Sequence, residues 1–355
     1  MKLLERARPE IAALQPYASA RMEAGAASIM LNANESPWPG ADVAFALNRY
    51  PDPQPAALRA ALAKLYAVAP EQVLIGRGSD EAIDLLVRAF CTAGRDAVAI
   101  APPTFGMYAV AARIQGAAVI EVPLGPAFEL DTDALLDALT DATKLIFVCT
   151  PNNPTGNLVP MPAIRRLSDA LRDHALLVVD EAYLEFAEGA PSAASLLRKH
   201  DNIAVLRTLS KAHALAGARV GAFIAAAPVV ELLRHIQAPY PLPQPSVDAA
   251  LAALSAAALA KTDTRTATLR GERERLARAL SAAPYVREVF VSAANFLCVR
   301  FRDARAAYRR LLACGIVVRD VSRYRALENC LRISVGSAQQ NAALLDALAR
   351  SEIAA

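Results

Sequence analysis

The sequence predicts an α/β protein, with a large sheet domain followed by a smaller α+β domain. Between residues 56 and 208, short and largely apolar runs alternate with amphipathic stretches of helical length. Apolar strands of this kind are buried on both faces, which is typical of a mostly parallel sheet covered by helices. From about residue 246 the alternation gives way to a long alanine-rich stretch and then to short mixed elements. With 55% hydrophobic residues over 355 positions, the chain can fill two packed cores.

The elements of the first part follow in a regular order. Pro55 is a start signal for the first helix, and the polar residues after Gly78 are typical of the start of the second. Apolar residues recur at helical spacing in that second segment, at Ile83, Leu86, Val87 and Phe90. We therefore expect helices at 56–68, 79–91, 107–114 and 161–173, and strands at 72–75, 97–101, 118–122, 144–149, 175–179 and 203–208.

The second part begins with the alanine-rich stretch, which predicts one helix over 246–279. Strands are then expected at 289–291, 295–302, 316–319 and 330–335, with helices at 304–314 and 338–349. These patterns divide the chain into an N-terminal arm (1–30), a large domain (31–245) and a small C-terminal domain (246–355).

Composition excludes several classes of protein. The net charge is +3 and no basic block occurs, so we expect no nucleic-acid partner. No apolar run is long enough to cross a bilayer, and the charged N-terminus does not resemble a signal peptide, so a cytoplasmic protein is expected. The five cysteines form no CxxC pair, and the four histidines lack metal-ligand spacing. We therefore expect reduced thiols and no metal.

Two segments at predicted strand ends are rich in turn-forming residues. The first, Gly76-Arg77-Gly78-Ser79-Asp80-Glu81, leads from a strand into a helix, where backbone N–H groups and the helix dipole favour an anion. Alone it is more typical of an ordinary capped helix after a tight turn, and it lacks the Lys-Ser/Thr of a Walker A loop. The second segment, Thr150-Pro151-Asn152-Asn153-Pro154-Thr155-Gly156, has more turn-forming residues than a simple turn requires.

Two further strand ends carry charged residues. Asp180 ends a buried strand, where a carboxylate requires a cationic partner, either a protein arginine or a protonated ligand nitrogen. Lys211, one of only six lysines, follows Ser210 after another buried strand, and Arg219 comes eight residues later. Lysine is the side chain that forms imines with carbonyl compounds, and burial or nearby cations lower its pKa. Ligands of open α/β sheets bind at these carboxyl ends of the strands.

Together, and in this order, the four segments resemble the fold-type-I aminotransferases that depend on pyridoxal phosphate (PLP). Asn153 precedes Asp180 by 27 residues and Asp180 precedes Lys211 by 31, both typical of that superfamily. Further segments are similar to the histidinol-phosphate aminotransferase branch, and the likeness runs from Tyr17 to the last helix. These segments are Leu31-Asn32-Ala33-Asn34-Glu35, Asn48-Arg49-Tyr50-Pro51, Pro103-Thr104-Phe105-Gly106-Met107-Tyr108, Gly315-Ile316-Val317-Val318-Arg319-Asp320 and Cys330-Leu331-Arg332-Ile333-Ser334-Val335-Gly336.

The resemblance implies a set of cofactor contacts. Lys211 matches the lysine that bonds covalently to the cofactor and moves the substrate proton. Asp180 matches the partner of the ring nitrogen, which a carboxylate keeps protonated. The other implied contacts are the 3′ oxygen for Asn153 and Tyr183, ring stacking for Tyr108, and the phosphate for Ser79, Asp80, Ser210, Arg219 and, from a neighbouring subunit, Tyr50. The resemblance thus implies a homodimer with shared active sites.

The resemblance also implies the substrates, which are histidinol phosphate and the pair 2-oxoglutarate and glutamate. Arg332 matches the arginine that binds the anionic group of either substrate. Arg319 and Tyr17 match residues that contact the substrate phosphate, and Asn34 and Glu35 lie in the segment near the substrate. The sequence departs from the usual pattern at Arg77 (for Asn), His213 (for Phe) and Ala218 (for Leu), none of which removes a group that the chemistry needs.

Other functions fit less well. An aromatic amino acid aminotransferase has no use for a phosphate-binding pair, and a threonine-phosphate decarboxylase of the same fold would not need 2-oxoglutarate. A non-catalytic PLP-binding regulator would carry a fused DNA-binding segment, for which we see no room. A P-loop NTPase, for which an acid after a buried strand is also typical, is excluded by the missing phosphate loop.

Overall fold

The structure, a computed structural model, describes residues 2–15, 29–42 and 47–349. Its main feature is a seven-stranded sheet in the order β1-β7-β6-β5-β4-β2-β3. β7 runs antiparallel to both of its neighbours, and all the other pairings are parallel. The strands are β1 (Val73–Gly76), β2 (Ala97–Ile100), β3 (Ala118–Glu121), β4 (Thr143–Cys149), β5 (Leu176–Asp180), β6 (Ile203–Thr208) and β7 (Gly221–Ala225).

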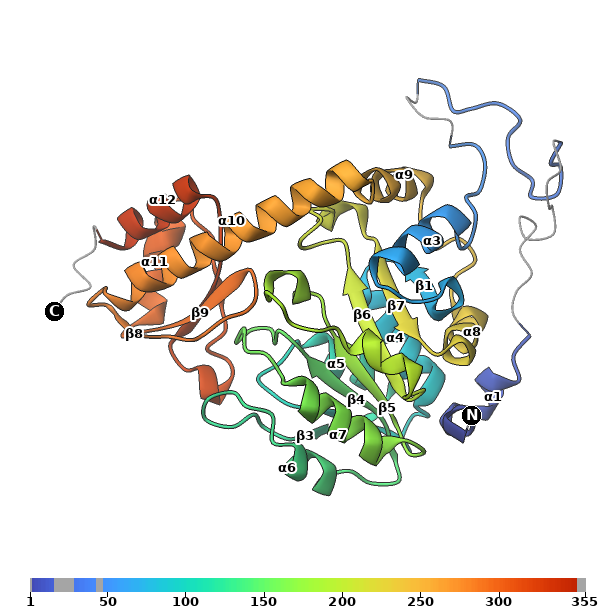
Figure 1. The fold of residues 1–355 in the computed structure, drawn as a ribbon, viewed down its shortest axis with the longest axis horizontal. Coiled ribbons are helices and arrows are strands. Elements are labelled where there is room, and N and C mark those ends of the chain that lie inside the picture. The colour runs from blue at the N-terminus through green and yellow to red at the C-terminus, as the bar shows by residue number, and fades with distance from the viewer. Residues whose placement is uncertain (1, 16–28, 43–46, 350–355) are drawn as a thin grey trace.

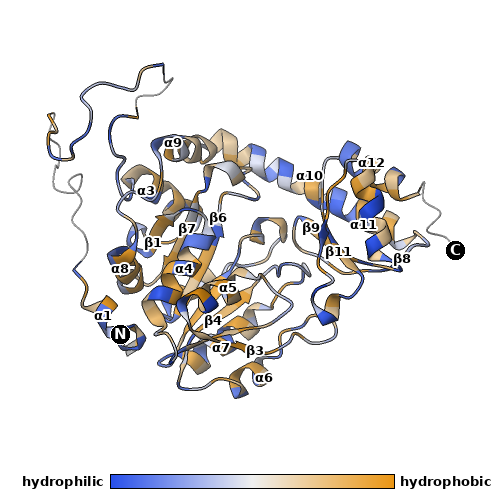
Figure 2. Cartoon of the chain, turned by 180° about the vertical axis from the view of Figure 1, so that it is seen from behind, coloured by the Kyte–Doolittle hydropathy of each residue, from blue (hydrophilic) through white to orange (hydrophobic). Residues whose placement is uncertain are grey.

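Helices cover both faces of this sheet, as its apolar strands predict. Along β4, Leu145 and Phe147 pack into one apolar layer, while Ile146 and Val148 point into the other. The first layer contains α4 (Ser79–Phe90), α5 (Met107–Gln115) and α8 (Ala227–Ile236). The second contains α3 (Ala56–Leu65), α6 (Thr132–Asp137), α7 (Met161–Leu171) and α9 (Gln244–Ala253). Figure 2 shows the apolar colour concentrated on the central strands, between these two layers.

The second part of the chain forms a separate antiparallel sheet in the order β10-β11-β9-β8 (Figure 1). Its strands are β8 (Val286–Val289), β9 (Phe296–Phe301), β10 (Arg319–Asp320) and β11 (Cys330–Ser334). The helices α10 (Ala256–Ser281), α11 (Ala304–Ala313) and α12 (Ala338–Ala349) pack on this sheet around their own apolar cluster. The predicted α/β class and the change of architecture are therefore confirmed, while the domain limits at residues 30 and 245 stay predictions.

Three expectations about elements were wrong. The single helix expected over 246–279 is two helices, α9 and α10, and the Ser255 hydroxyl between them accepts a hydrogen bond from the Ala258 N–H of α10. The strand expected at 316–319 is reduced to the two residues of β10. The strand expected at 289–291 lies earlier, as β8. The strand β7 and the helices α6 and α8 were not predicted.

The N-terminal residues Lys2–Arg6 form a 3₁₀ turn and Pro9–Ala12 a single helical turn, α1, which packs against α8. Across the described residues, the structure has no helix of the length and apolar character that a bilayer span requires.

Candidate active site

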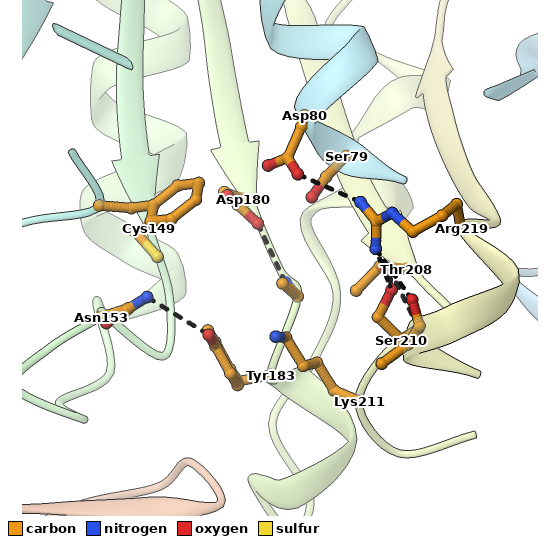
Figure 3. A pocket seen from close by; sticks show the side chains of 13 residues that line it. Ser79, Asp80, Cys149, Asn153, Asp180, Tyr183, Thr208, Ser210, Lys211 and Arg219 are labelled. Atoms are coloured by element: carbon orange, nitrogen blue, oxygen red, sulfur yellow. Dashed lines mark hydrogen bonds and ion pairs between the residues drawn. The ribbon is translucent and has the colours of Figure 1, made fainter. Parts of the chain in front are cut away.

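The candidate active site is a cavity of about 140 Å³ at the carboxyl ends of β4, β5 and β6, beside the first turn of α4. Figure 3 shows charged and polar side chains from these four elements pointing into it. Because the three strands are parallel, their carboxyl ends meet at one edge of the sheet, where ligands of such sheets bind. The lining residues are Ser79, Asp80, Phe105, Cys149, Asn153, Asp180, Ala182, Tyr183, Thr208, Ser210, Lys211, Ala216 and Arg219.

One side of the cavity suits an anion. α4 begins at Ser79, so its first backbone N–H groups lie at the cavity together with the positive end of a twelve-residue helix. The Arg219 guanidinium donates to Ser210 Oγ at 3.3 Å and pairs with Asp80 Oδ2 at 3.2 Å, as Figure 3 shows. This group therefore sets a fixed positive charge beside the helix end.

Glycine makes this close approach possible. Gly78, the N-cap of α4, has φ +77° and ψ −178°, a conformation that side chains disfavour. Gly221, at the start of β7, packs so closely that an added Cβ would lie 2.6 Å from the Gly78 carbonyl carbon. Gly78 and Gly221 together therefore allow the first turn of α4 to lie directly against the start of β7.

Asp180 lies on the opposite side and is buried, with 3% of its surface exposed. Its Oδ2 accepts a hydrogen bond of 2.6 Å from the Tyr108 hydroxyl, and its Oδ1 one of 3.1 Å from the Ala182 N–H. Burial raises the pKa of this carboxyl to about 6, although the two hydrogen bonds act in the opposite direction and lower it. Among the described residues, no lysine, arginine or histidine forms an ion pair with it. The carboxylate is thus suited to a cation that a ligand would bring.

Lys211 lies between these two sides and is exposed to the cavity. Its Nζ is 5.5 Å from the centre of the Tyr183 ring. Partial burial, and then the charges of Arg332 and Arg219, lower the pKa of this amine below its usual range. A lysine of lowered pKa is present more often as the neutral amine, which is the form that acts as a nucleophile or takes up a proton.

A polar chain closes the site toward the second sheet. Asn153 Nδ2 donates to the Tyr183 hydroxyl at 3.3 Å, and Arg332 donates to Asn153 Oδ1. Arg332 comes from β11, and its guanidinium lies 5.4 Å from the centre of the Phe296 ring. The second sheet therefore contributes a cation that reaches the residues of the first.

A second hollow of about 380 Å³ adjoins the cavity, because Phe105 and Asn153 line both. It contains three guanidinium groups and one carboxylate, those of Arg319, Arg323, Arg332 and Asp320. The Tyr324 hydroxyl crosses from this wall to the Thr104 carbonyl at 2.9 Å. The excess of positive charge suits a substrate with an anionic group.

The structure brings most of the predicted site residues together. Eight of them line the cavity, namely Ser79, Asp80, Asn153, Asp180, Tyr183, Ser210, Lys211 and Arg219, and Arg319 and Arg332 line the adjoining hollow. Their individual roles stay predictions. Tyr17 lies outside the described residues.

Three predicted residues lie away from both hollows. Glu35 pairs with the Arg49 guanidinium at 2.8 Å and accepts from the Tyr50 N–H at 2.6 Å. Asn34, beside it, has a left-handed backbone with φ 54°. The Tyr50 ring is half-exposed and stacks on Tyr240, with 4.5 Å between ring centres. Within one chain, Glu35 and Tyr50 thus contact each other, Arg49 and Tyr240, and none of these contacts reaches the candidate active site.

The expectation that Tyr108 stacks on the cofactor needs correction. Tyr108 has no exposed surface, and its ring is stacked on Phe147 with 4.6 Å between centres. Phe105 lines the cavity instead and touches Tyr108 edge-on. A signal in the sequence was available, because Tyr108, Ala111 and Ala112 share one face of α5 at helical spacing, which marks the residue as core.

Sequence reasoning also missed Arg323 and Tyr324, whose loop carries no periodic signal. Of the departures noted, the Arg77 side chain pairs with Glu81 at 2.8 Å, and Ala218 packs in the second apolar layer. His213 lines a different cavity, of about 410 Å³, and burial lowers the pKa of its imidazole. None of the three side chains enters the candidate site.

Comparison with known proteins gives one consistent result. The family model for aminotransferase class I and II matches residues 27–348. The chain is 54% identical to the histidinol-phosphate aminotransferase of Stenotrophomonas maltophilia, over 98% of this chain and 97% of that protein. It is 52% identical to that of Xanthomonas campestris pv. campestris, over 99% of each. The crystal structure of the Sinorhizobium meliloti histidinol-phosphate aminotransferase in complex with pyridoxal-5′-phosphate is similar, with a TM-score of 0.79, 27% identity and coverage of 97% of this chain and 96% of that one.

Proposed function

The chain belongs to the aminotransferase class I and II family, and from this premise we propose that it transfers the amino group of histidinol phosphate to 2-oxoglutarate with PLP as cofactor. The products are imidazole-acetol phosphate and glutamate, which places the reaction in histidine biosynthesis. Relatives that share more than half of their residues with this chain along almost its whole length carry that name. The observation that carries the proposal is the meeting of an anion site, a buried carboxylate without a cation and a lysine of lowered pKa in one cavity.

These three groups fit PLP, which has a phosphate, a ring nitrogen that can be protonated and an aldehyde. The N–H groups of Ser79 and Asp80, with Ser210 and Arg219, would hold the phosphate through charge-assisted hydrogen bonds. Asp180 would hold the ring nitrogen in its protonated form. That protonated nitrogen is the cation that this buried carboxylate otherwise lacks.

Other residues would complete the cofactor site. Asn153 and Tyr183, already joined by a hydrogen bond, would hold the phenolic oxygen of the ring. Phe105 has a face on the cavity and would cover the ring. When bound, the cofactor links covalently to an amine and withdraws electrons from the carbon that loses a proton. The residues of the cavity therefore match each polar group of the cofactor.

Lys211 has two tasks in this scheme. Its Nζ would hold the cofactor before the substrate amine arrives, and it would then take the proton from the substrate Cα and return it on the cofactor side. Both tasks require the neutral amine, and burial with two neighbouring guanidinium groups favours that form. Lys211→Ala should remove turnover and the covalent link while leaving the fold intact.

The second hollow supports a substrate with a phosphate. Arg332 would bind the anionic group of either substrate, since one guanidinium fork accepts a carboxylate or a phosphate. Arg319 would contact the phosphate of histidinol phosphate, together with Tyr17. A dianion beside three guanidinium groups is favoured over a neutral aromatic side chain, which speaks against an aromatic amino acid aminotransferase.

A homodimer is part of the proposal. Residues 29–42 extend away from the first sheet in Figure 1. They expose Leu31 and Trp38, at 87% and 75% of their surface, and Tyr50, further along the chain, is 48% exposed. Apolar side chains this exposed favour burial against a second copy, where Tyr50 would reach the phosphate site of the neighbouring subunit. A cytoplasmic location belongs to the same proposal, because the proposed reaction is a step of amino-acid biosynthesis.

The absorbance spectrum of the purified protein tests the reaction. After PLP is added, histidinol phosphate should convert the cofactor band completely in a single turnover, and 2-oxoglutarate should restore it. Lys211→Ala, which keeps the phosphate site, is the matched control and should show neither change. If only phenylalanine or threonine phosphate converts the band, the family assignment stands and the substrate assignment fails. If carbon dioxide is released and 2-oxoglutarate has no effect, the enzyme is a decarboxylase.

A further inference from the structure

The buried residue Tyr108 lines neither the cavity nor the adjoining hollow, yet its hydroxyl contacts a residue of the candidate active site. Its ring lies between Phe147, which is stacked on one face at an interplanar angle of 7°, and Phe105, which meets it at 83°. Its hydroxyl donates a hydrogen bond of 2.6 Å to the carboxylate of Asp180 and lies close to the thiol of Cys149. No other side-chain hydroxyl or charged group contributes a hydrogen bond to this carboxylate among the described residues.

From this geometry we propose that Tyr108 is a positioning residue, whose hydroxyl holds Asp180 as an anion turned toward the cofactor ring. The inference rests on the proposed function, because it assigns Asp180 to the ring nitrogen of PLP. Tyr108 itself has no surface on the cavity, so Asp180 and Phe105 would lie between it and the cofactor.

The physical reason is the cost of a buried charge. The ring nitrogen requires an ionised carboxylate, but burial favours the neutral acid and raises the pKa of Asp180 to about 6. The Tyr108 hydroxyl opposes that effect, because it donates a short hydrogen bond to the charged form. The hydroxyl is a reliable donor, since burial and the nearby Asp180 raise its own pKa well above its usual value.

The geometry also fixes which way the carboxylate points. Ala182 N–H holds Oδ1 and Tyr108 holds Oδ2, so neither oxygen can rotate away. Each carboxylate oxygen has two lone pairs and keeps one for the ring nitrogen. Because Phe147 and Phe105 hold the Tyr108 ring, the hydroxyl arrives preorganised and loses little conformational freedom when the cofactor binds.

Other titratable groups surround Asp180 and affect its charge. Asp80 and Glu181 raise its pKa, while Lys211, Tyr183 and Cys149 lie close enough to interact with it electrostatically. Of these groups, the Cys149 thiol also interacts with the Tyr108 hydroxyl, and burial raises the pKa of this thiol so that it stays protonated throughout the test. The other groups and the cofactor itself titrate in the wild type and in a Tyr108 variant alike. The difference between the two proteins therefore reports on the hydrogen bond from Tyr108 to Asp180.

The test is the pH dependence of PLP affinity in the full-length protein, measured from pH 5 to pH 9 by absorbance titration of the apoprotein. Affinity should fall on the acid side as Asp180 takes up a proton. In Tyr108→Phe the midpoint of that fall should move upward by roughly one to two pH units, the effect of one hydrogen bond to a charged group. Near pH 6 the affinity should drop about tenfold or more, whereas at pH 9 it should change little.

The matched control is Tyr66→Phe. It removes another buried tyrosine hydroxyl, which lies at a different cavity and makes no hydrogen bond within the described part of the chain. Its midpoint should stay at the wild-type value. A loss of affinity in Tyr108→Phe that is equal at every pH, or a shift that Tyr66→Phe shares, would overturn the proposal, because either result indicates a merely structural role.

A second variant keeps the shape of the side chain and moves the midpoint the other way. Replacing Tyr108 by 3-fluorotyrosine makes the hydroxyl a stronger donor, so the midpoint should fall below that of the wild type. An unchanged or raised midpoint contradicts the proposal. Failure of the proposed function is distinguishable, because in that case the wild-type protein itself would bind no PLP at any pH.

Discussion

The anion site depends on the absence of a side chain at Gly221, and Gly221→Ala tests this most directly. A Cβ at this position would lie 2.6 Å from the Gly78 carbonyl carbon, 2.8 Å from Gly78 Cα and 2.9 Å from Ser79 N. All three atoms belong to the backbone, so no flexible side chain can move aside. Either β7 must shift or the first turn of α4 must retreat, and the Ser79 N–H moves with it.

The size of the effect follows from that overlap. Forcing one extra methyl group into a packed site costs about 1–3 kcal/mol. The phosphate contacts depend on direction, and a charge-assisted hydrogen bond contributes about 1.5–3 kcal/mol. If one such bond is lost, PLP should bind about 10- to 100-fold more weakly. Lys211 and Asp180 are not displaced, so the substitution separates the phosphate contacts from the rest of the site.

Absorbance titration of the apoprotein with PLP measures this affinity, and competition with inorganic phosphate reports on the anion site alone. Gly271→Ala is the matched control, because it adds the same methyl group in mid-helix α10, where nothing lies within 4 Å. It should leave the affinity unchanged and raise the free energy of unfolding by up to about 1 kcal/mol. The reasoning is refuted if Gly221→Ala binds PLP as tightly as the wild type does.

Three further predictions concern single side chains. Arg319→Ala should raise KM for histidinol phosphate at least tenfold more than KM for glutamate, and equal losses in steady-state kinetics would contradict a phosphate contact. Asp180→Asn should weaken PLP binding yet stabilise the apoprotein. The pKa of Asp180 is raised to about 6, so its favourable contribution to stability is present below about pH 4 and lost as the pH rises through 6. Urea denaturation at pH 8 should then show a gain of about 1–3 kcal/mol, and at pH 4 none. His213→Phe should stabilise the protein by about 1 kcal/mol without changing PLP affinity, because both ring nitrogens are buried and find no hydrogen-bond partner among the residues that the structure describes. A loss of stability in thermal unfolding would show that the imidazole has a function there.

The sequence predicted which residues meet at the candidate site better than it predicted how the side chains around them pack. Ser79, Asp180 and Lys211 each follow a strand of the parallel sheet, and the topology of such sheets brings these ends together. Tyr108 was misplaced because two aromatic residues lie three positions apart in one turn. The spacing of Tyr108 with Ala111 and Ala112 on one face of α5 distinguishes the buried ring from that of Phe105, which precedes the helix.

The second part of the chain was less predictable for a physical reason. The break between α9 and α10 depends on Ser255, a single capping residue among alanines that favour helix equally well. β10 is only two residues long, and its extent is decided by pairing with β11 rather than by any pattern of its own. Arg323 and Tyr324 follow it in a loop, where contacts with the distant Thr104 fix their positions.

The arginines of the second hollow come from a different part of the chain than the polar groups of the cavity, and this has a practical consequence for enzyme engineering. Every cofactor-facing polar group proposed here comes from residues before 220, whereas the three arginines of the adjoining hollow lie between 319 and 332. A library restricted to residues 319–324 could therefore redirect substrate choice while the groups around PLP remain untouched. The hydrogen bond from Tyr324 to the Thr104 carbonyl sets the limit of that freedom, because it joins the variable wall to the constant one.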